Sequence, residues 1–504
     1  MDTVGFLFQG FSNALSLQNL FFALVGSILG TLVGVLPGIG PTAGIAMLLP
    51  LTTLLPPIPA IIMLAAIYYG AMYGGSTTSI LMNIPGEISS VITCVDGYEM
   101  AKQGRAAPAL AIASISSFIA GTLGLVGLSF FSPPLANMAL KMGPPEIFGL
   151  VVFAFSMVAS MAGKSLLKGV TSAALGMIIC LIGLDPQLGV KRLTFGSVTL
   201  MGGVDFIAII MGLFAMKEVF QNIGAKAGLI SSARLGSWWR MIKWSEIKQS
   251  LGAIIRSTIT GFFLGCLPGC TPGIVTFMAY DLEKKFSKNR ANFGKGAIEG
   301  VAAPEGANNA CTSGGFVPLL TLGIPPSTSL AVLLSGLMIY GLQPGPLLFE
   351  KQPVFVWTVI ASMYIGNVML LILNLPLVGI WARMVRVPYH FIAPLILLFC
   401  FIGTYSVRNS FFDAGTCLVF GFIGLFMDKL KIPSLPLVLA LILAPMMEDS
   451  LRQSISMGGG SLAILWSRPI ALALMGAGFL TMVIILFGRY RRAKAEVHLG
   501  TEEN

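Results

Sequence analysis

Charged residues are scarce in this chain: Asp, Glu, Lys and Arg make up only 10% of its 504 residues. A soluble domain carries about 25% of them to cover its water-facing surface, so the composition excludes an ordinary soluble protein. Hydrophobic residues make up 55%, and apolar runs recur along the whole length. Many of these runs approach the roughly 20 residues that cross a bilayer as a helix. We therefore expect an all-α polytopic membrane protein.

Histidine is also scarce, and the seven cysteines include no CxxC pair. His390 and His498 alone leave little for a histidine-built metal centre or for His-dependent catalysis. The cysteines lie mostly in apolar runs, which indicates small buried residues rather than a disulfide or metal framework. A GKS triplet occurs at 163–165, but Val158 stands where a P-loop needs its first glycine, so no ATP site is predicted. We expect neither an enzyme nor an organic cofactor.

Positive charge exceeds negative charge, with 31 Lys and Arg against 21 Asp and Glu. The bases are scattered between apolar runs rather than gathered on one face, which is typical of juxtamembrane charge and not of nucleic-acid binding. Before Lys102 the chain has no Lys or Arg, so its start lacks the positive region of a cleavable signal peptide. The expected surroundings are a lipid bilayer, without a nucleic-acid partner.

Several stretches occur twice in the same order. GVLPGIGP at 34–41 matches GCLPGCTP at 265–272, and GGSTTSILMNIPGEISS at 74–90 matches GGFVPLLTLGIPPSTSL at 314–330. Later in each half, GLFAMKE resembles ILAPMME. We interpret the chain as an internal duplication followed by one more apolar segment and a basic tail. The expected divisions are 1–240, 250–460 and 461–504.

The paired Pro-Gly clusters lie inside apolar runs, where proline and glycine interrupt a helix. Discontinuous helices at matching places of two repeats are typical of transporters, whose substrate sites form there. A duplicated structural bundle that uses glycine only for close helix packing is the alternative. Because irregular backbone at membrane depth must be buried in protein or line a cavity, the clusters favour a transporter.

The distribution of basic residues predicts the topology, since cytoplasmic loops are enriched in them. Re-entrant hairpins near 18–55 and 252–280, each followed by about five crossings, place most of the bases on one side. Five is odd, so the two repeats are predicted to be inverted, with the N-terminus outside and the C-terminus inside. The expected crossings are 58–82, 106–131, 146–163, 166–184 and 200–217 in the first half, 311–341, 354–381, 390–407, 412–427 and 433–450 in the second, and 463–487 at the end.

A hairpin tip that starts a new helix exposes backbone N–H groups and the positive end of the helix dipole, which suits a carboxylate substrate. Glycine lets the backbone approach such a ligand closely, and nearby hydroxyls add donors. For any single hydroxyl, packing within its own helix is the alternative role. The candidate substrate-binding residues are Gly38, Gly40, Pro41, Thr42, Ser76, Thr77, Gly269, Thr271, Pro272, Gly273, Ser327 and Thr328.

The segment APEGANNACTSGG at 303–315 carries an acid beside apolar sequence. A carboxylate in a membrane is costly and indicates a functional site, although a solvated loop end is the alternative. With carbonyls freed at a helix break, its oxygens suit a cation, either Na⁺ or H⁺. The candidate cation-coupling residues are Glu305, Asn308, Asn309, Gly314 and Gly315. We interpret Asp96 and Glu99 as surface loop residues.

Four of these stretches carry a family resemblance: GVLPGIGPTAGIAMLLPLT, GGSTTSILMNIPGE, VDGYEMAKQGRAAPAL and APEGANNACTSGGFVPLLTLGIPPS. The chain resembles the large membrane subunit of the tripartite tricarboxylate transporters over nearly its whole length. The resemblance implies an ion-coupled secondary transporter of the bacterial inner membrane that imports citrate-like carboxylates. It also implies two partners, a small membrane subunit and a periplasmic binding protein. A carboxylate-conducting channel or a scaffolding membrane subunit remains the alternative.

Overall fold

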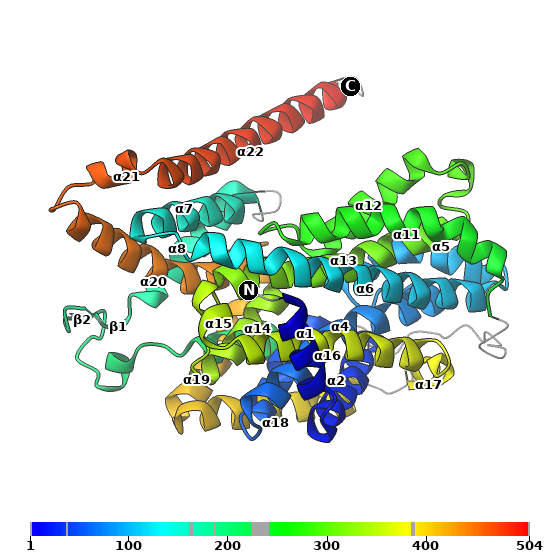
Figure 1. Ribbon diagram of the computed structural model, residues 1–504, viewed down its shortest axis with the longest axis horizontal. Coiled ribbons are helices and arrows are strands. Elements are labelled where there is room, and N and C mark those ends of the chain that lie inside the picture. The colour runs from blue at the N-terminus through cyan, green and yellow to red at the C-terminus, as the bar shows by residue number, and fades with distance from the viewer. Residues whose placement is uncertain are drawn as a thin grey trace. The chain divides into compact units, whose positions relative to one another are not determined.

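The computed structural model describes residues 3–36, 39–160, 165–185, 187–222, 241–384 and 389–501 (Figure 1). Contacts between residues divide the chain into two compact units. Unit 1 comprises Met1–Ala139 and Asp205–Leu425, and unit 2 comprises Leu140–Val204 and Phe426–Asn504. Each unit therefore contains residues from both halves of the sequence.

The described residues of unit 1 form helices joined by turns and loops, without a strand, and its helix ends follow the local sequence. Ser16 caps the second helix by accepting a hydrogen bond from the Asn19 backbone N–H, and Asn83 ends the fourth in a left-handed conformation. The first part of the unit consists of α1 (Thr3–Ala14), α2 (Leu17–Val35), α3 (Gly40–Thr52), α4 (Pro57–Met82), η1 (Ile88–Ser90), α5 (Val91–Lys102) and α6 (Ala106–Ala139).

The remainder of unit 1 begins with a short irregular helical stretch, in which one turn is a π-helix, η3. Its elements are α9 (Phe206–Ile210), η3 (Met211–Met216), α10 (Lys217–Asn222), α11 (Trp244–Gly265), α12 (Pro272–Phe286), η5 (Arg290–Asn292), α13 (Glu299–Leu322), α14 (Thr328–Ile339), α15 (Pro346–Lys351), α16 (Pro353–Asn374), α17 (Val378–Met384), α18 (Tyr389–Arg408) and α19 (Phe411–Lys429), the last of which ends in unit 2.

Unit 2 combines helices with the two strands found among the described residues, β1 (Gly183–Leu184) and β2 (Lys191–Arg192), which pair antiparallel. Its other elements are α7 (Pro144–Ser160), α8 (Leu166–Cys180), η2 (Thr199–Gly202), α20 (Ser434–Met457), α21 (Ala463–Ser467) and α22 (Pro469–Thr501). Helix α20 packs against both α7 and α8.

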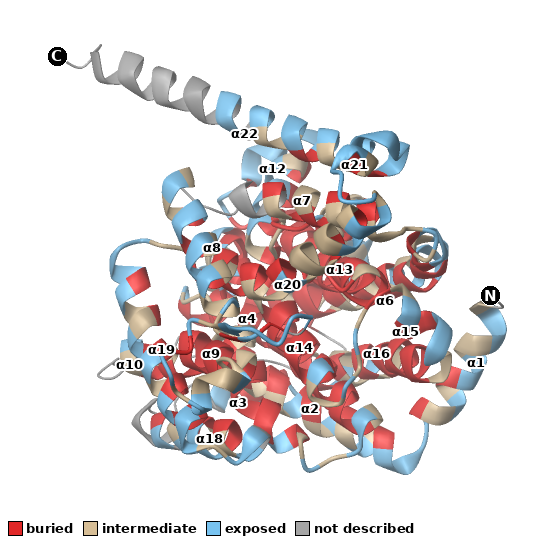
Figure 2. Ribbon diagram, turned by 90° about the vertical axis from the view of Figure 1, so that its left-hand side faces the viewer, coloured by how far each residue is buried: buried red, intermediate tan, exposed pale blue. Residues whose placement is uncertain are grey.

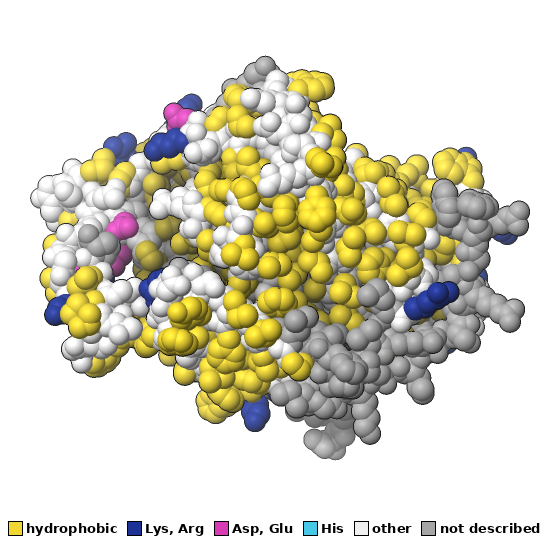
Figure 3. All heavy atoms as spheres, turned by 90° about the horizontal axis from the view of Figure 1, so that it is seen from below, with side chains coloured by type: hydrophobic (Ala, Val, Ile, Leu, Met, Phe, Trp, Pro, Cys, Tyr) yellow, Lys and Arg dark blue, Asp and Glu magenta, His cyan; other side chains and the backbone are white. Residues whose placement is uncertain are grey.

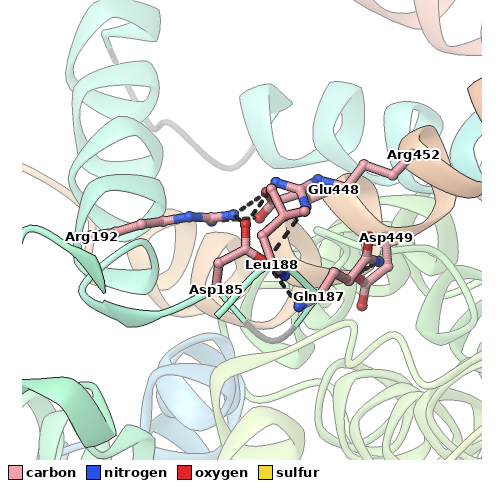
Figure 4. A network of polar contacts seen from close by, with 7 residues as sticks. All are labelled: Asp185, Gln187, Leu188, Arg192, Glu448, Asp449 and Arg452. Carbon is pink, nitrogen blue, oxygen red and sulfur yellow. Dashed lines mark hydrogen bonds and ion pairs between the residues drawn. The ribbon is translucent and has the colours of Figure 1, made fainter. Parts of the chain in front are cut away.

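Charged side chains join the strands of unit 2 to α20 (Figure 4). Asp185 accepts hydrogen bonds from Arg192 and, at 2.9 Å, from Nη2 of Arg452. Glu448 bonds both arginines, at 2.8 Å to Arg192 and 2.7 Å to Arg452. Two bases and two acids thus form one balanced network that holds the turn after α8 against the end of α20.

The core of unit 1 is built on α4 and α13, which are buried along nearly their whole lengths (Figure 2). A helix that is apolar all round is expected in a core, and α4 fits that pattern. Helix α13 does not, because it is buried although it carries Glu299, Glu305, Asn308 and Asn309. Its polar groups therefore need partners inside the protein.

Six described helices are long and apolar enough to cross a bilayer, namely α2, α4, α6, α16, α19 and α20. One face of the molecule carries mainly apolar side chains, with few charged ones among them (Figure 3). These features confirm the expected all-helical polytopic membrane protein.

Several expected crossings differ from the observed elements. The span 354–381 is divided, because α16 ends at Asn374 and α17 begins at Val378. The span 311–341 is interrupted, because α13 ends at Leu322 and α14 begins only at Thr328. The span 200–217 is not one regular helix but η2, α9 and η3 in succession. The last span, 463–487, is broken before Pro469, which begins α22.

Candidate functional site

Glu305 lies in the centre of unit 1, on α13, with 1% of its surface exposed. Its Oε2 accepts hydrogen bonds from Ser76 of α4 at 2.6 Å and from Ser117 of α6 at 3.5 Å. Its Oε1 accepts one from Thr93 of α5 at 2.6 Å. Three helices of the first half therefore supply hydroxyls to one carboxylate of the second, which excludes a solvated loop end.

A second buried carboxylate, Glu87, lies close to the turn of α13 that carries Glu305 and Asn308. Glu87 comes after α4 and directly before η1, and only 8% of it is exposed. Its Oε1 accepts hydrogen bonds from the Ser89 hydroxyl and, at 3.2 Å, from Nδ2 of Asn308. Glu87 was not among the residues predicted from the sequence. It carried the signal used for Glu305, an acid inside apolar sequence.

Asn308 and Asn309 point polar oxygens into the core without a partner. Nδ2 of Asn309 donates to the Glu305 backbone oxygen at 3.2 Å, one helical turn earlier. The Oδ1 atoms of both asparagines are buried and have no hydrogen-bond partner. Most buried polar atoms in proteins are bonded, so two unpaired oxygens beside a carboxylate need an explanation.

The first Pro-Gly cluster contacts the other half of the chain. Gly38 lies outside the described residues, whereas Gly40 adopts a positive φ of 63° and Pro41 occupies the first turn of α3. The Thr42 hydroxyl lies 3.2 Å from that of Thr328 and 2.7 Å from that of Ser329, both at the start of α14. Ser327 caps α14 through a bond from the Leu330 N–H.

The second Pro-Gly cluster contacts its own half of the chain through Gly269 and the first half through Gly273. Gly269 has a φ of 95°, and its N–H donates to the Pro326 oxygen at 3.3 Å. Thr271 precedes α12 without capping it through its side chain, and Pro272 begins the helix. A Cβ on Gly273 would lie 2.8 Å from the side chain of Ile88 in η1. The first N–H groups of α12, like those of α3, receive no side-chain cap.

The other predicted residues lie within regular helices. Ser76 bonds Glu305 and so lies with the predicted cation residues, and Thr77 is buried beside it. We expected freed carbonyls at a helix break near Gly314 and Gly315, but α13 continues through both. Pro318 still leaves the Gly314 carbonyl without its helical N–H partner, and the Cys266 thiol donates to that carbonyl at 3.4 Å. A Cβ on Gly314 would lie 2.2 Å from the Phe262 oxygen, so this glycine permits α11 to pack closely.

Asp96 was wrongly interpreted as a surface loop residue. It lies on α5, is fully buried, and accepts N–H bonds of 2.8–2.9 Å from Gly294, Gly296 and Ala297. The Tyr280 hydroxyl donates to it at 2.7 Å. One carboxylate therefore fixes the connection between α12 and α13 against α5.

Comparison with known proteins places this arrangement in a family. The family model described as the tripartite tricarboxylate transporter TctA family matches residues 20–439. The chain belongs to the TctA family. A protein of Agrobacterium vitis, described as an uncharacterized 52.8 kDa protein in the TAR-I ttuC' 3' region, is 42% identical over 99% of both chains.

A second relative from the same organism covers part of the chain. It is described as an uncharacterized protein in the TAR-II ttuC' 3' region and is 40% identical over 47% of this chain and 98% of its own. No solved structure matches. Membership of the TctA family makes the chain a membrane subunit of a transporter, and TctA is a transporter family rather than an enzyme family.

Proposed function

We propose that this TctA-family chain is the permease subunit of an ion-coupled secondary transporter that imports tricarboxylates or related carboxylates by alternating access. It works with a small membrane subunit and a periplasmic binding protein in the bacterial inner membrane, its N-terminus periplasmic and its C-terminus cytoplasmic. The observation that carries the proposal is the buried Glu305, which has hydroxyl partners but no Lys or Arg partner among the described residues. A membrane carboxylate of this kind indicates an ion pathway.

Inverted repeats are part of the proposal, and reciprocal packing supports them. Helices α2, α3 and α4 are followed in the second half by α11, α12 and α13 in the same order. Helix α3 packs against α14 of the other half, and α12 packs against η1 of the first. A pseudo-twofold relation would produce this exchange, and such repeats permit alternating access.

The carboxylate substrate is assigned to the ends of broken helices. Helix α12 begins with Pro272, and α3 has Pro41 as its second residue. Both helices lack side-chain caps, so N–H groups at their starts are available to an anion. The positive ends of both helix dipoles add attraction. In this proposal Glu305, Asn308 and Asn309 hold the coupling cation, Na⁺ or H⁺, through oxygen atoms.

Uptake by proteoliposomes tests this function. The vesicles contain this chain and its small membrane subunit, and the external solution contains the binding protein with a labelled carboxylate. We expect accumulation driven by an inward Na⁺ or H⁺ gradient. A channel would equilibrate the label without accumulation, and a scaffold would give no flux through this chain.

The variant Glu305→Gln keeps the shape of the side chain and removes its charge. Uptake should then require a much higher concentration of the driving cation, while the binding protein captures substrate normally. Unchanged cation dependence would remove Glu305 from the coupling site.

A further inference from the structure

Two carboxylates approach α4 at adjacent residues. The Glu87 side chain lies against Gly75, where an added Cβ would be only 2.8 Å from its Cγ. The next residue, Ser76, donates its hydroxyl to Glu305. Asn308 lies one turn after Glu305 on α13 and donates to Glu87. The two acids therefore belong to one centre, with Asn308 between them.

No described Lys or Arg pairs with either carboxylate. Their partners are neutral donors: Ser89 and Asn308 for Glu87, and Ser76, Thr93 and Ser117 for Glu305. Neutral donors stabilise a carboxylate but leave its net charge in the core. Buried ions without a counter-charge are strongly destabilising, so this centre is balanced only when positive charge enters it.

The unpaired atoms of the centre are oxygens. Oδ1 of Asn308 and Oδ1 of Asn309 are buried without a partner, on the face of α13 that carries Glu305. Carboxylate, amide, hydroxyl and carbonyl oxygens are the ligands that hard cations prefer. A proton would neutralise a carboxylate equally well, since a proton and a sodium ion each carry one positive charge.

Each carboxylate has its own hydroxyl shell. Ser89 serves Glu87 alone, whereas Ser76, Thr93 and Ser117 serve Glu305 alone. The amide group of Asn308 points a donor at Glu87, which separates the two acids rather than opening a shared cavity between them. This arrangement favours two singly charged cations over one divalent ion bridging both acids.

We propose that Glu87 and Glu305 form two adjoining cation sites that share Asn308, and that each takes one Na⁺ or one proton. The proposal rests on the transport function above and deepens it, because it assigns two positive charges to the transport cycle. Two cations offset the charge of a dicarboxylate and most of that of a tricarboxylate. Import of such an anion into a negatively charged cell interior is then less opposed by the membrane potential.

Direct cation binding tests the proposal without transport. The purified full chain in lipid nanodiscs is titrated with NaCl, and bound ²²Na⁺ is counted per chain. We expect two ions for the natural chain, one for Glu87→Gln, one for Glu305→Gln and none for the double variant. The matched control is Glu99→Gln, which changes an exposed acid on α5 and should keep two.

A second arm distinguishes protons from sodium. If the natural chain binds no Na⁺, proton uptake is measured by titration of each variant between pH 4 and 10. Protons bound are counted relative to the double variant. Two protons for the natural chain and one for each single variant support the proposal. The proposal is overturned if Glu87→Gln still binds as many cations as the natural chain. It is also overturned if the natural chain binds one divalent ion in place of two monovalent ones.

Folding is checked by circular dichroism and gel filtration. Should Glu87→Gln not fold, Ser89→Ala decides instead, because it removes the hydroxyl shell of Glu87 alone. One of the two affinities should fall about tenfold and the other should stay. Two unchanged affinities overturn the proposal. If the natural chain binds two cations but transports no carboxylate, the two cation sites stand and the proposed function is wrong. If it transports a carboxylate with only one bound cation, the proposed function stands and the second cation site is wrong.

Discussion

The hydroxyls of Thr42 and Ser329 lie 2.7 Å apart, although 287 residues separate them in the chain. Thr42 is in the first turn of α3, and Ser329 is in the first turn of α14. The contact joins a broken helix of the first half to a broken helix of the second. Of the two residues, Thr42 was a predicted site residue, and Ser329 follows the predicted Thr328, whose hydroxyl lies 3.2 Å from that of Thr42.

A double-mutant cycle measures this contact. Thr42→Val and Ser329→Ala each remove one hydroxyl at nearly constant shape. We expect the free energy of unfolding to fall with each change, and the double variant to lose about 1 kcal/mol less than the sum of the two. Chemical unfolding in detergent provides the three values. Purely additive losses would mean that the two hydroxyls do not bond each other.

Asp96 is expected to determine stability rather than transport chemistry. Asp96→Asn removes the charge that three N–H groups and the Tyr280 hydroxyl face. Bonds to charged groups are worth about 1.5–3 kcal/mol each, so we expect a loss of at least about 2 kcal/mol in unfolding free energy. Glu99→Gln on the same helix breaks only an exposed ion pair with Lys102 and should stay within about 1 kcal/mol. Equal losses would contradict this account.

Gly273 allows a test of whether a tip glycine serves a ligand or packing. In Gly273→Ala the new Cβ meets the Ile88 side chain, which is 79% exposed and free to move away. We expect normal folding but uptake lowered by about tenfold, because a Cβ keeps the ligand from the backbone. The second variant, Gly273→Ala with Ile88→Ala, should not recover uptake. Recovery would show that the glycine serves packing with Ile88.

In unit 2, Asp185 should make stability depend on pH. Burial raises the pKa of Asp185, but the N–H groups of Gln187 and Leu188 and the two guanidinium groups outweigh it and hold this pKa well below its usual range (Figure 4). A lowered pKa stabilises the fold above the ordinary Asp value of about 3.9 and loses that stabilisation as the pH falls below it.

The melting temperature as a function of pH checks this. The natural chain should lose stability as the pH falls from about 4 toward 2, and Asp185→Asn should lack this part of the decline. Gln187→Ala is the matched control, since it keeps the backbone N–H that bonds Asp185 and should retain the decline. If Asp185→Asn follows the natural profile, the carboxylate is not held in its charged form.

Much of the fold and part of the site could be predicted from the sequence, for reasons that particular residues illustrate. Apolar length indicated α4 and α6, and an acid in apolar sequence indicated Glu305. Glu87 carried the same signal, but its link to Asn308 depends on how α4 and α13 pack, which no local pattern encodes. We expected carbonyls near Gly314 and Gly315 to be freed at a helix break, but α13 runs through both residues. From the sequence alone, a glycine that lets two helices pack closely looks the same as a glycine that interrupts a helix. What distinguishes Gly314 is the Phe262 carbonyl packed against it, which only the structure shows.

The hydroxyls around Glu305 should differ in importance according to their distances. Thr93 donates at 2.6 Å, a strong bond to a carboxylate, whereas Ser117 is at 3.5 Å, at the limit of a hydrogen bond. Thr93→Val keeps the shape of the side chain and should raise the half-saturating concentration of the driving cation about tenfold, since it removes a bond that orients the cation's ligand. Ser117→Ala should leave that concentration within about twofold of the natural value.

Uptake rates measured over a range of driving cation, with substrate-loaded binding protein in excess, provide both concentrations. Because the two hydroxyls bond different helices to the same side chain, a general loosening of the core would affect both variants alike. If Glu305 holds the cation, the half-saturating concentration should instead rise only in Thr93→Val, which removes the shorter hydrogen bond. Equal shifts in the two variants, or no shift in Thr93→Val, would separate the hydroxyl shell from cation binding and leave it a role in packing.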